Sequence, residues 1–253
     1  MFASQEKVQG RPIRLIAAAC KNMGIGKNGW LPWTLPMEFQ YLLDKISSVS
    51  RPGKKNLLVW GRICWFSAPE NLHPIDNAVN VVLSRTISTL PKHAHYLCNN
   101  FESAVLLATS PLLNEEVETI WILGGVEIYK KALAHPWCDL IYLTDIMADF
   151  DCDTFFPGFD RNVYRLQDQR CSGSSVDLVR ICFDKHLACK KYVQHFPGVP
   201  DECQQECGIR YKFQVFKKEL GYRSKQEVNS NGLQTSVQPE DHGEKTINDT
   251  NVI

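Results

Sequence analysis

The sequence has no excess charge of either sign, no long apolar run and no recognisable leader. It carries 28 Lys and Arg residues against 28 Asp and Glu residues, so it offers no basic field to nucleic acid or an anionic membrane, although RNA binding is not excluded. No apolar run reaches the ~18 residues that a spanning helix needs. Residues 1–11 lack the apolar core of a secretory signal and are expected to form a flexible N-terminus. These absences favour a cytoplasmic protein that needs neither membrane nor nucleic acid.

Cysteine is present, but not at the spacing of a redox or metal motif. None of the ten cysteines belongs to a CxxC pair, and in a reducing compartment most should be free thiols. Cys203 and Cys207 are close in sequence, as are Cys182, His186 and Cys189, but neither spacing matches a common zinc site. The sequence therefore predicts no metal centre, and it shows no internal repeat.

Buried strands and helices alternate along the first two thirds of the chain. Short apolar runs at 13–19, 56–60, 79–83, 118–123 and 140–146 predict strands. Amphipathic or apolar stretches at 37–46, 101–107 and 128–134 predict helices, with a short helix following Gly61. This alternation is typical of an α/β protein with a mostly parallel sheet.

The character of the sequence changes beyond Asp153. Residues 211–216 alternate strongly between apolar and polar side chains, which predicts an antiparallel strand at a sheet edge. The preceding stretch 169–194 is rich in Cys, Ser and Lys. Residues 220–253 are polar and almost free of large apolar side chains, which predicts a disordered tail.

Residues 22–39, NMGIGKNGWLPWTLPMEF, place one carboxylate in an apolar surround. Three glycines suit a loop with positive φ angles or close backbone approach, and Pro36 suits the first turn of a helix that starts near Leu35. Glu38 then falls in that first turn. One interpretation is a charge that complements the helix dipole; the other is a functional carboxylate.

Four features fall at the carboxyl ends of predicted strands, where open α/β sheets bind ligands. They are the loop 22–33, Gly61-Arg62, Ser84-Arg85 and Gly124-Gly125. Gly-Gly before a helix exposes backbone N–H groups suited to a pyrophosphate, and the arginines suit a phosphate monoester. Each feature alone can be an ordinary turn or corner, and GxGxxG is absent. Together they favour NADP over NAD.

Several motifs, in this order, resemble the dihydrofolate reductase family: MGIGKNGWLPW, WTLPMEF, GRICWFS, VVLSR, WILGGVEIYK and DCDTFFP, with GIRYKFQVF similar to its closing strand. The resemblance covers about 13–168 and 195–218. It implies a mixed, mostly parallel sheet flanked by helices with a C-terminal antiparallel hairpin. The domain would span 12–219, with 169–194 as an insertion that either binds a partner or is a mistranslated intervening sequence.

The resemblance also implies an activity. A member of this family is an oxidoreductase that reduces 7,8-dihydrofolate to 5,6,7,8-tetrahydrofolate with NADPH, by hydride transfer to pterin C6. Such an enzyme would be a cytoplasmic monomer, serve one-carbon and thymidylate metabolism, and be an antifolate target. Glu38 would orient and polarise the pterin, and water admitted beside a mobile loop 24–30 would deliver the proton.

The family's site positions transfer to this sequence residue by residue. Glu38, helped by Thr144, matches the carboxylate that holds the pterin edge. Positions that match the walls of the pterin and nicotinamide pocket are Ile16, Leu31, Trp33, Phe39, Leu42, Ser67 and Tyr129. Positions that match the cofactor site are Ala18, Ile25, Gly29, Gly61, Arg62, Cys64, Ser84, Arg85, Gly124, Gly125, Val126 and Glu127.

Three positions depart from the family pattern. Ala78 stands where an arginine usually binds the folate tail, and no Arg or Lys occurs between Arg62 and Arg85. Cys64 replaces a threonine, and a thiol is a weaker hydrogen-bond donor. Trp30 replaces a small or acidic residue in the loop. These departures leave two alternatives: a catalytically weak homologue that binds a pterin, nucleotide or partner, and a reductase of a tail-free pterin.

Overall fold

The computed structural model describes residues 10–167 and 202–219 of the chain. The chain divides into two units between Glu219 and Leu220, and all described residues belong to the first. The predicted flexible N-terminus, apart from its last residues, and the predicted insertion and tail lie outside the described residues.

Among the described residues, a nine-stranded mixed sheet forms the centre of the fold, in the order β10-β11-β7-β1-β6-β3-β4-β5, with β9 also pairing with β11. Six strands form its parallel part: β1 (Ile13–Cys20), β3 (Lys55–Gly61), β4 (Ala78–Leu83), β5 (Tyr96–Cys98), β6 (Val117–Ile122) and β7 (Cys138–Ile146). Three are antiparallel: β9 (Tyr164–Leu166), β10 (Gln204–Glu206) and β11 (Ile209–Lys218). The predicted α/β class with a mostly parallel sheet is confirmed.

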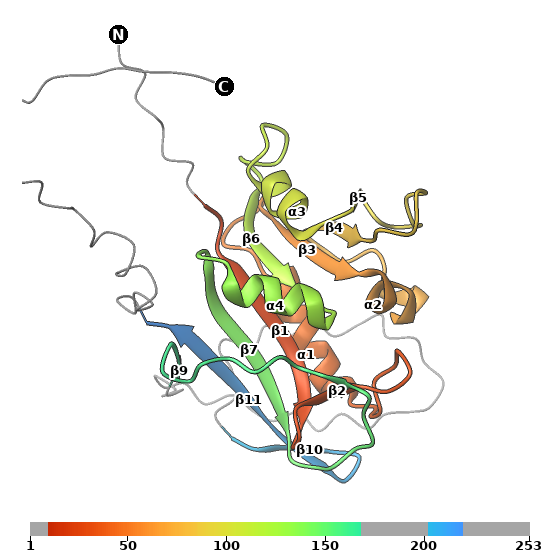
Figure 1. The fold of residues 1–253 in the computed structure, drawn as a ribbon, viewed down its shortest axis with the longest axis vertical. Helices are drawn as coiled ribbons and strands as arrows, with labels where there is room; N and C mark the ends of the chain where they lie inside the picture. Colours follow the sequence, from red (N-terminus) through yellow and green to blue (C-terminus); the bar gives the residue numbers. More distant parts are fainter. Residues whose placement is uncertain (1–9, 168–201, 220–253) are drawn as a thin grey trace, which may run out of the picture. The chain divides into compact units, whose positions relative to one another are not determined.

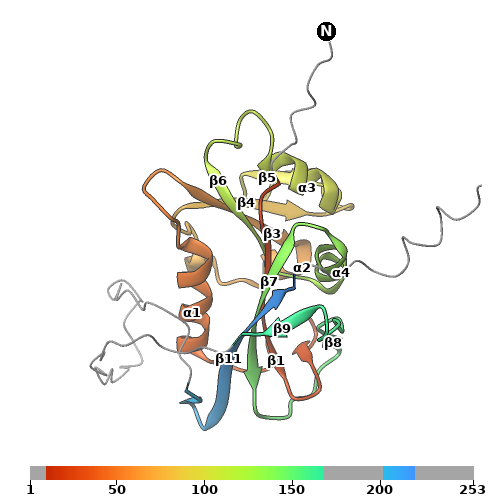
Figure 2. The same cartoon turned by 90° about the vertical axis from the view of Figure 1, so that its left-hand side faces the viewer.

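Helices cover both faces of the sheet (Figures 1 and 2). They are α1 (Pro36–Ser47), α2 (Arg62–Ser67), α3 (Phe101–Ala108) and α4 (Val126–Ala134), with a 3-10 turn at Glu70–Leu72. Successive side chains of a strand point to opposite faces, so Leu57 and Val59 of β3 join the core under α3 and α4, while Leu58 and Trp60 join the core on the α1 side. Burial on both faces explains why the parallel strands have almost continuous apolar sequences.

The structure corrects one prediction about the closing strand. β11 is antiparallel to β7, as predicted, but it does not form the sheet edge, because β9 and β10 pair with its other side. Its side chains Tyr211, Phe213 and Phe216 are buried. The alternation therefore indicates an antiparallel strand with one covered face, but not its position in the sheet. The strands β9 and β10 that flank it have three residues each, too few to show a periodicity.

A small second sheet anchors the first part of the glycine-rich loop, Gly24–Gly26. β2 (Gly24–Gly26) pairs antiparallel with β8 (Thr154–Phe155), which follows β7 (Figure 2). Neither strand was predicted, because glycines weaken strand propensity and two residues carry no periodicity. The pairing attaches the loop after β1 to the segment after β7.

Candidate active site

Glu38 lies in the first turn of α1 and points at the sheet. The helix starts where the sequence predicted, with Leu35 as its N-cap residue and Pro36 at its first position. Glu38 is only 5% exposed, and the hydroxyl of Thr144 on β7 donates a hydrogen bond to its Oε1 at 2.8 Å. A carboxylate that served only the helix dipole would lie at the surface, so the dipole interpretation does not account for this burial.

The surroundings of Glu38 raise its pKa to about 7. Burial is the largest cause, because it removes water from the charged form; the hydrogen bond from Thr144 opposes it, and the negative charge of Glu206 adds to it. Near neutral pH the carboxyl group is therefore balanced between its two forms. A cationic or hydrogen-bond-donating ligand would favour the ionised form.

Aromatic side chains surround the Glu38–Thr144 pair. Phe213 of β11 lies opposite Thr144 across the strand pair, and Tyr41 stacks on Phe213 with ring centroids 3.8 Å apart. Trp33 is buried and meets Phe150 edge to face at 5.2 Å. The indole Nε1 of Trp33 is buried and has no hydrogen-bond partner among the described residues. The pair thus lies in an apolar environment of low dielectric constant, from which water is largely excluded.

The other predicted pocket residues divide between the two faces of β1. Ile16 and Leu42 belong to the core on the α1 side. Tyr129 belongs to the opposite core, and its hydroxyl donates a hydrogen bond to the carbonyl of Ile16 at 2.9 Å. Phe39 is half-buried, Ser67 donates to the carbonyl of Cys64, and Leu31 is exposed. Thr144 thus connects Glu38 to Ala18, its partner on β1, and Trp33 packs in the same apolar cluster as Ala18. Ile16, Leu42 and Tyr129 lie in the other two clusters, and Leu31 is exposed.

Parallel strands deliver the glycines of the predicted cofactor site to one edge of the sheet. The N–H of Gly61, at the end of β3, donates to the carbonyl of Gly124, beyond β6, at 2.7 Å. A Cβ on Gly61 would lie 2.8 Å from the backbone nitrogen of Gly125. The Gly124-Gly125 peptide is cis, and Gly124 has φ +122°. Only glycine fits this close backbone approach.

Cys64 packs against the same glycines. A Cβ on Gly124 would lie 2.8 Å from the Sγ of Cys64, and burial raises the pKa of the Cys64 thiol. The thiol is therefore protonated at neutral pH. In the structure this thiol lies against the Gly124-Gly125 turn.

Free donors remain at this edge. Because α4 starts at Val126, the N–H groups of Val126 and Glu127 have no acceptor within the helix, which suits an anion. The carboxylate of Glu127 forms an ion pair with Lys130, with Oε1 and Nζ 2.8 Å apart. Arg62 and Arg85 are exposed and form no ion pair with any described residue. The oxygen of Ser84 accepts from the N–H groups of Thr86 and Ile87.

The loop after β1 is a hairpin in the structure. Lys27 and Trp30 exchange two backbone hydrogen bonds, of 2.8 and 3.0 Å, across Asn28 and Gly29, both of which have positive φ. The N–H of Asn28 donates to Asp153 Oδ2 at 2.8 Å. A Cβ on Gly29 would lie 3.3 Å from the Cγ2 of Ile63, so the hairpin tip lies against α2. Ile25, by contrast, packs on the core.

Comparison with known proteins decides the family. The family model described as dihydrofolate reductase matches residues 12–183. The chain belongs to the dihydrofolate reductase family. The dihydrofolate reductase of Bos taurus is 38% identical over 209 residues, which cover 82% of this chain and 98% of that protein. The enzyme of Drosophila melanogaster is 44% identical over 145 residues, covering 56% of this chain and 78% of that protein.

Solved structures agree. The structure of Schistosoma mansoni dihydrofolate reductase superimposes with a TM-score of 0.64 at 28% identity, covering 83% of this chain and 100% of that one. The family consists of oxidoreductases, so the chain is an enzyme of that class. The resemblance inferred from the motifs is confirmed.

The structure adds site residues that local sequence did not indicate. Glu206 of β10 accepts from the backbone N–H of Met37 at 3.0 and 3.1 Å, and the hydroxyl of Tyr211 lies 3.5 Å from it. The charge at the start of α1 is therefore Glu206, which leaves Glu38 free to face the sheet. No local signal could have found Glu206, because it lies 169 residues from Met37.

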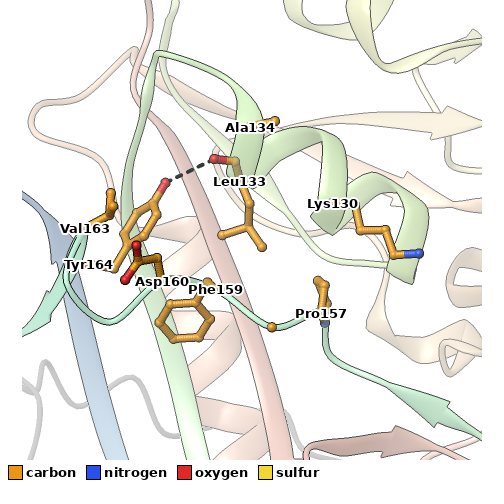
Figure 3. A pocket seen from close by; sticks show the side chains of 9 residues that line it. Lys130, Leu133, Ala134, Pro157, Phe159, Asp160, Val163 and Tyr164 are labelled. Atoms are coloured by element: carbon orange, nitrogen blue, oxygen red, sulfur yellow. Dashed lines mark hydrogen bonds between the residues drawn. The ribbon is translucent and has the colours of Figure 1, made fainter. Parts of the chain in front are cut away.

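Two pockets on the surface of the described residues lie away from Glu38. One, of about 350 Å³, lies between α4 and the segment 157–164 (Figure 3) and is lined by Lys130, Leu133, Ala134, Pro157, Gly158, Phe159, Asp160, Val163 and Tyr164. The other, of about 420 Å³, adjoins Ser84-Arg85 and is lined by Phe66, Thr86, Ile87, Ser88, Thr89, Leu90 and Pro91. The second extends the edge where the predicted cofactor residues gather.

Residues 10–167 and 202–219 contain neither a membrane-spanning helix nor a cluster of metal ligands. No helix among them is long and apolar enough to cross a membrane. No group of three or more His, Cys, Asp and Glu side chains among them is placed to hold a metal ion.

Proposed function

We propose that this chain reduces 7,8-dihydrofolate to 5,6,7,8-tetrahydrofolate with NADPH, by hydride transfer to pterin C6. The observation that carries the proposal is the Glu38–Thr144 pair, a buried carboxyl group with a raised pKa and one side-chain donor. The dihydrofolate reductases that it resembles over most of their length support the same reaction. A homologue that only bound a partner would have no need of this pair.

Glu38 is proposed to hold the 2-amino group and N3 of the pterin. A carboxylate accepts two parallel hydrogen bonds from such an edge, which fixes the orientation of the ring and polarises it. Thr144 donates to one lone pair of Oε1. The other lone pair of Oε1 and both lone pairs of Oε2 remain for the ligand. The Glu38 carboxyl thus orients the ring while its aromatic surround excludes water.

The residues at the carboxyl edge of the sheet fit NADPH. A Cβ on Gly61 would lie 2.8 Å from the nitrogen of Gly125, and a Cβ on Gly124 would lie 2.8 Å from Cys64 Sγ, so glycine keeps the backbone bare beside the first N–H groups of α4. A pyrophosphate suits such a site. Arg62, Arg85 and Ser84 would hold the 2′-phosphate, whose charge NADH lacks. The cofactor supplies the hydride when bound.

The chain's own residues would then position the pterin ring and allow a proton to reach pterin N5. Glu38 is committed to the 2-amino and N3 edge of the pterin, so water is proposed to bring the proton to pterin N5. That water is proposed to enter beside the loop 24–30. We further propose that the enzyme is a cytoplasmic monomer that serves one-carbon and thymidylate metabolism and is an antifolate target.

NADPH oxidation by the purified full chain tests the proposal. We expect rapid oxidation with dihydrofolate, slower oxidation when NADH replaces NADPH, and loss of that preference in Arg85→Ala. A tail-free dihydropterin serves as the second substrate. Equal, rapid rates on both substrates would favour the tail-free reductase, and NADPH binding without oxidation of either substrate would favour the binding homologue.

A further inference from the structure

Cys20 and Cys152 lie side by side although 132 positions separate them, with their Sγ atoms 3.8 Å apart. Cys20 ends β1 and is 2% exposed, and Cys152 lies in the half-buried segment before β8. Both are free thiols. A disulfide requires an S–S distance of about 2.05 Å, so the sulfur atoms would have to approach by less than ~2 Å.

The backbone holds the two thiols in place from both sides. The N–H of Lys21 donates to the carbonyl of Ala148, and the N–H of Asp153 donates to the carbonyl of Gly26. Pairing of β2 with β8 continues this contact (Figure 2). The two segments therefore stay close to each other. Within this backbone arrangement, a change of side-chain rotamer can move the Sγ of Cys152.

The same two thiols contact the start of the glycine-rich loop. Cys20 Sγ donates to Asn22 Oδ1 at 3.0 Å, and that oxygen also accepts from the N–H of Gly24 at 3.1 Å. A Cβ on Gly24 would lie 2.5 Å from the Sγ of Cys152. Movement of either sulfur must therefore disturb Asn22 and Gly24, at the start of the hairpin, and both thiols belong to the same apolar cluster as Trp33.

We propose that Cys20 and Cys152 are a site of reversible disulfide formation that controls the movement of the loop 22–31. The oxidant is a low-molecular-weight disulfide. The Cys152 thiolate attacks one of its sulfurs, forming a mixed disulfide and releasing one thiol. The Cys20 thiolate then attacks the Cys152 sulfur and releases the second thiol. The protein loses two electrons and two protons, which appear in the two released thiols.

The effect on activity rests on the proposed function. If the loop must open and close for substrate exchange, a bond between its base and the segment before β8 slows turnover. Reduction breaks the bond and restores the rate. Burial, together with the neighbouring Cys20, raises the pKa of Cys152, so little of this thiol is ionised at neutral pH and its exchange with the oxidant is slow.

The test treats the reduced full chain with oxidised glutathione and maps its disulfides in non-reduced digests. We expect a Cys20–Cys152 peptide, several-fold slower dihydrofolate turnover, slower amide exchange over 22–31, and recovery with dithiothreitol. Cys152→Ser should resist the oxidant, whereas Cys203→Ser, which removes an exposed thiol, should stay sensitive.

Two results would overturn the proposal. One is the absence of the Cys20–Cys152 peptide when exposed thiols have fully reacted, and the other is a mapped bond that changes neither exchange nor turnover. The mapping and the amide exchange use the wild-type chain and do not depend on catalysis. Failure of the reductase assay would therefore refute the proposed function without affecting the disulfide result.

Discussion

At the scale of the residue, Glu38 makes the protein's stability depend on pH. Its pKa is about 7 in the folded chain against 4.5 ordinarily, so the folded state binds the proton more tightly than the unfolded state does. The free energy of unfolding should therefore fall as pH rises from about 4.5 to 7, and change no further above that range. At 1.36 kcal/mol per pKa unit the total is about 3 kcal/mol.

Glu38→Gln isolates this contribution. Glutamine keeps the acceptor for Thr144 and has no charge to bury, so the variant should be more stable than the wild type at pH 8 by up to about 3 kcal/mol and nearly equal at pH 5. Urea unfolding at the two pH values measures the difference. An equal difference at both would show that the carboxyl group does not titrate as described.

The family resemblance predicts that Ala78 replaces the arginine that binds the folate tail. It begins β4 and is half-buried, and no lysine or arginine lies between Arg62 and Arg85. Ala78→Arg would supply a charged donor to the folate tail, so the KM for dihydrofolate should fall about tenfold, the equivalent of 1.4 kcal/mol. The KM for a tail-free dihydropterin should not change. A parallel change in both would show that the arginine acts on the fold and not on the tail.

At the scale of the element, the turn between β6 and α4 depends on glycine. Gly124→Ala would place a side chain in a conformation with φ +122° and 2.8 Å from Cys64 Sγ. Such strain costs about 1–3 kcal/mol, and we expect a lower melting temperature together with weaker NADPH binding. Gly158→Ala, where no atom lies within 4 Å, is the matched control and should change neither. Comparable losses in both variants would contradict this explanation.

Elements were predicted well where burial dominates the sequence. The parallel strands β1, β3, β4, β6 and β7 and the helices α1, α3 and α4 appear at the predicted places, because buried runs and period-3.6 patterns are local signals. The strands β2, β5, β8, β9 and β10 were missed because each has three residues or fewer. They form by pairing with distant segments, which a local pattern does not encode.

The site shows the same division. The family resemblance assigned Glu38 and Thr144 to the pterin edge, and the structure joins them by a hydrogen bond. Glu206, which takes the place of the helix-start charge, arrives through the antiparallel hairpin β10-β11 and could not be inferred from local sequence. The roles assigned to the cofactor residues remain predictions.

At the scale of the whole molecule, the sheet should require its last described strand. β11 lies between β7 and the strands β9 and β10, and buries Tyr211, Phe213 and Phe216. A chain that ends at Asp168 would expose these contacts of β7 and should not fold. A chain that ends at Glu219, where the two units divide, should keep its melting temperature and its turnover. Circular dichroism of both chains tests this, and a folded shorter chain would contradict it.

The central claim is that Glu38 orients the substrate, and steady-state dihydrofolate reduction by Glu38→Ala measures it most directly. The value of kcat/KM should fall by at least about a hundredfold, because the pterin loses the buried carboxylate proposed to orient it. Glu102→Ala, which removes an exposed carboxylate that pairs with Lys131, should leave it unchanged. Near-full turnover by a folded Glu38→Ala enzyme would contradict the role assigned to this residue.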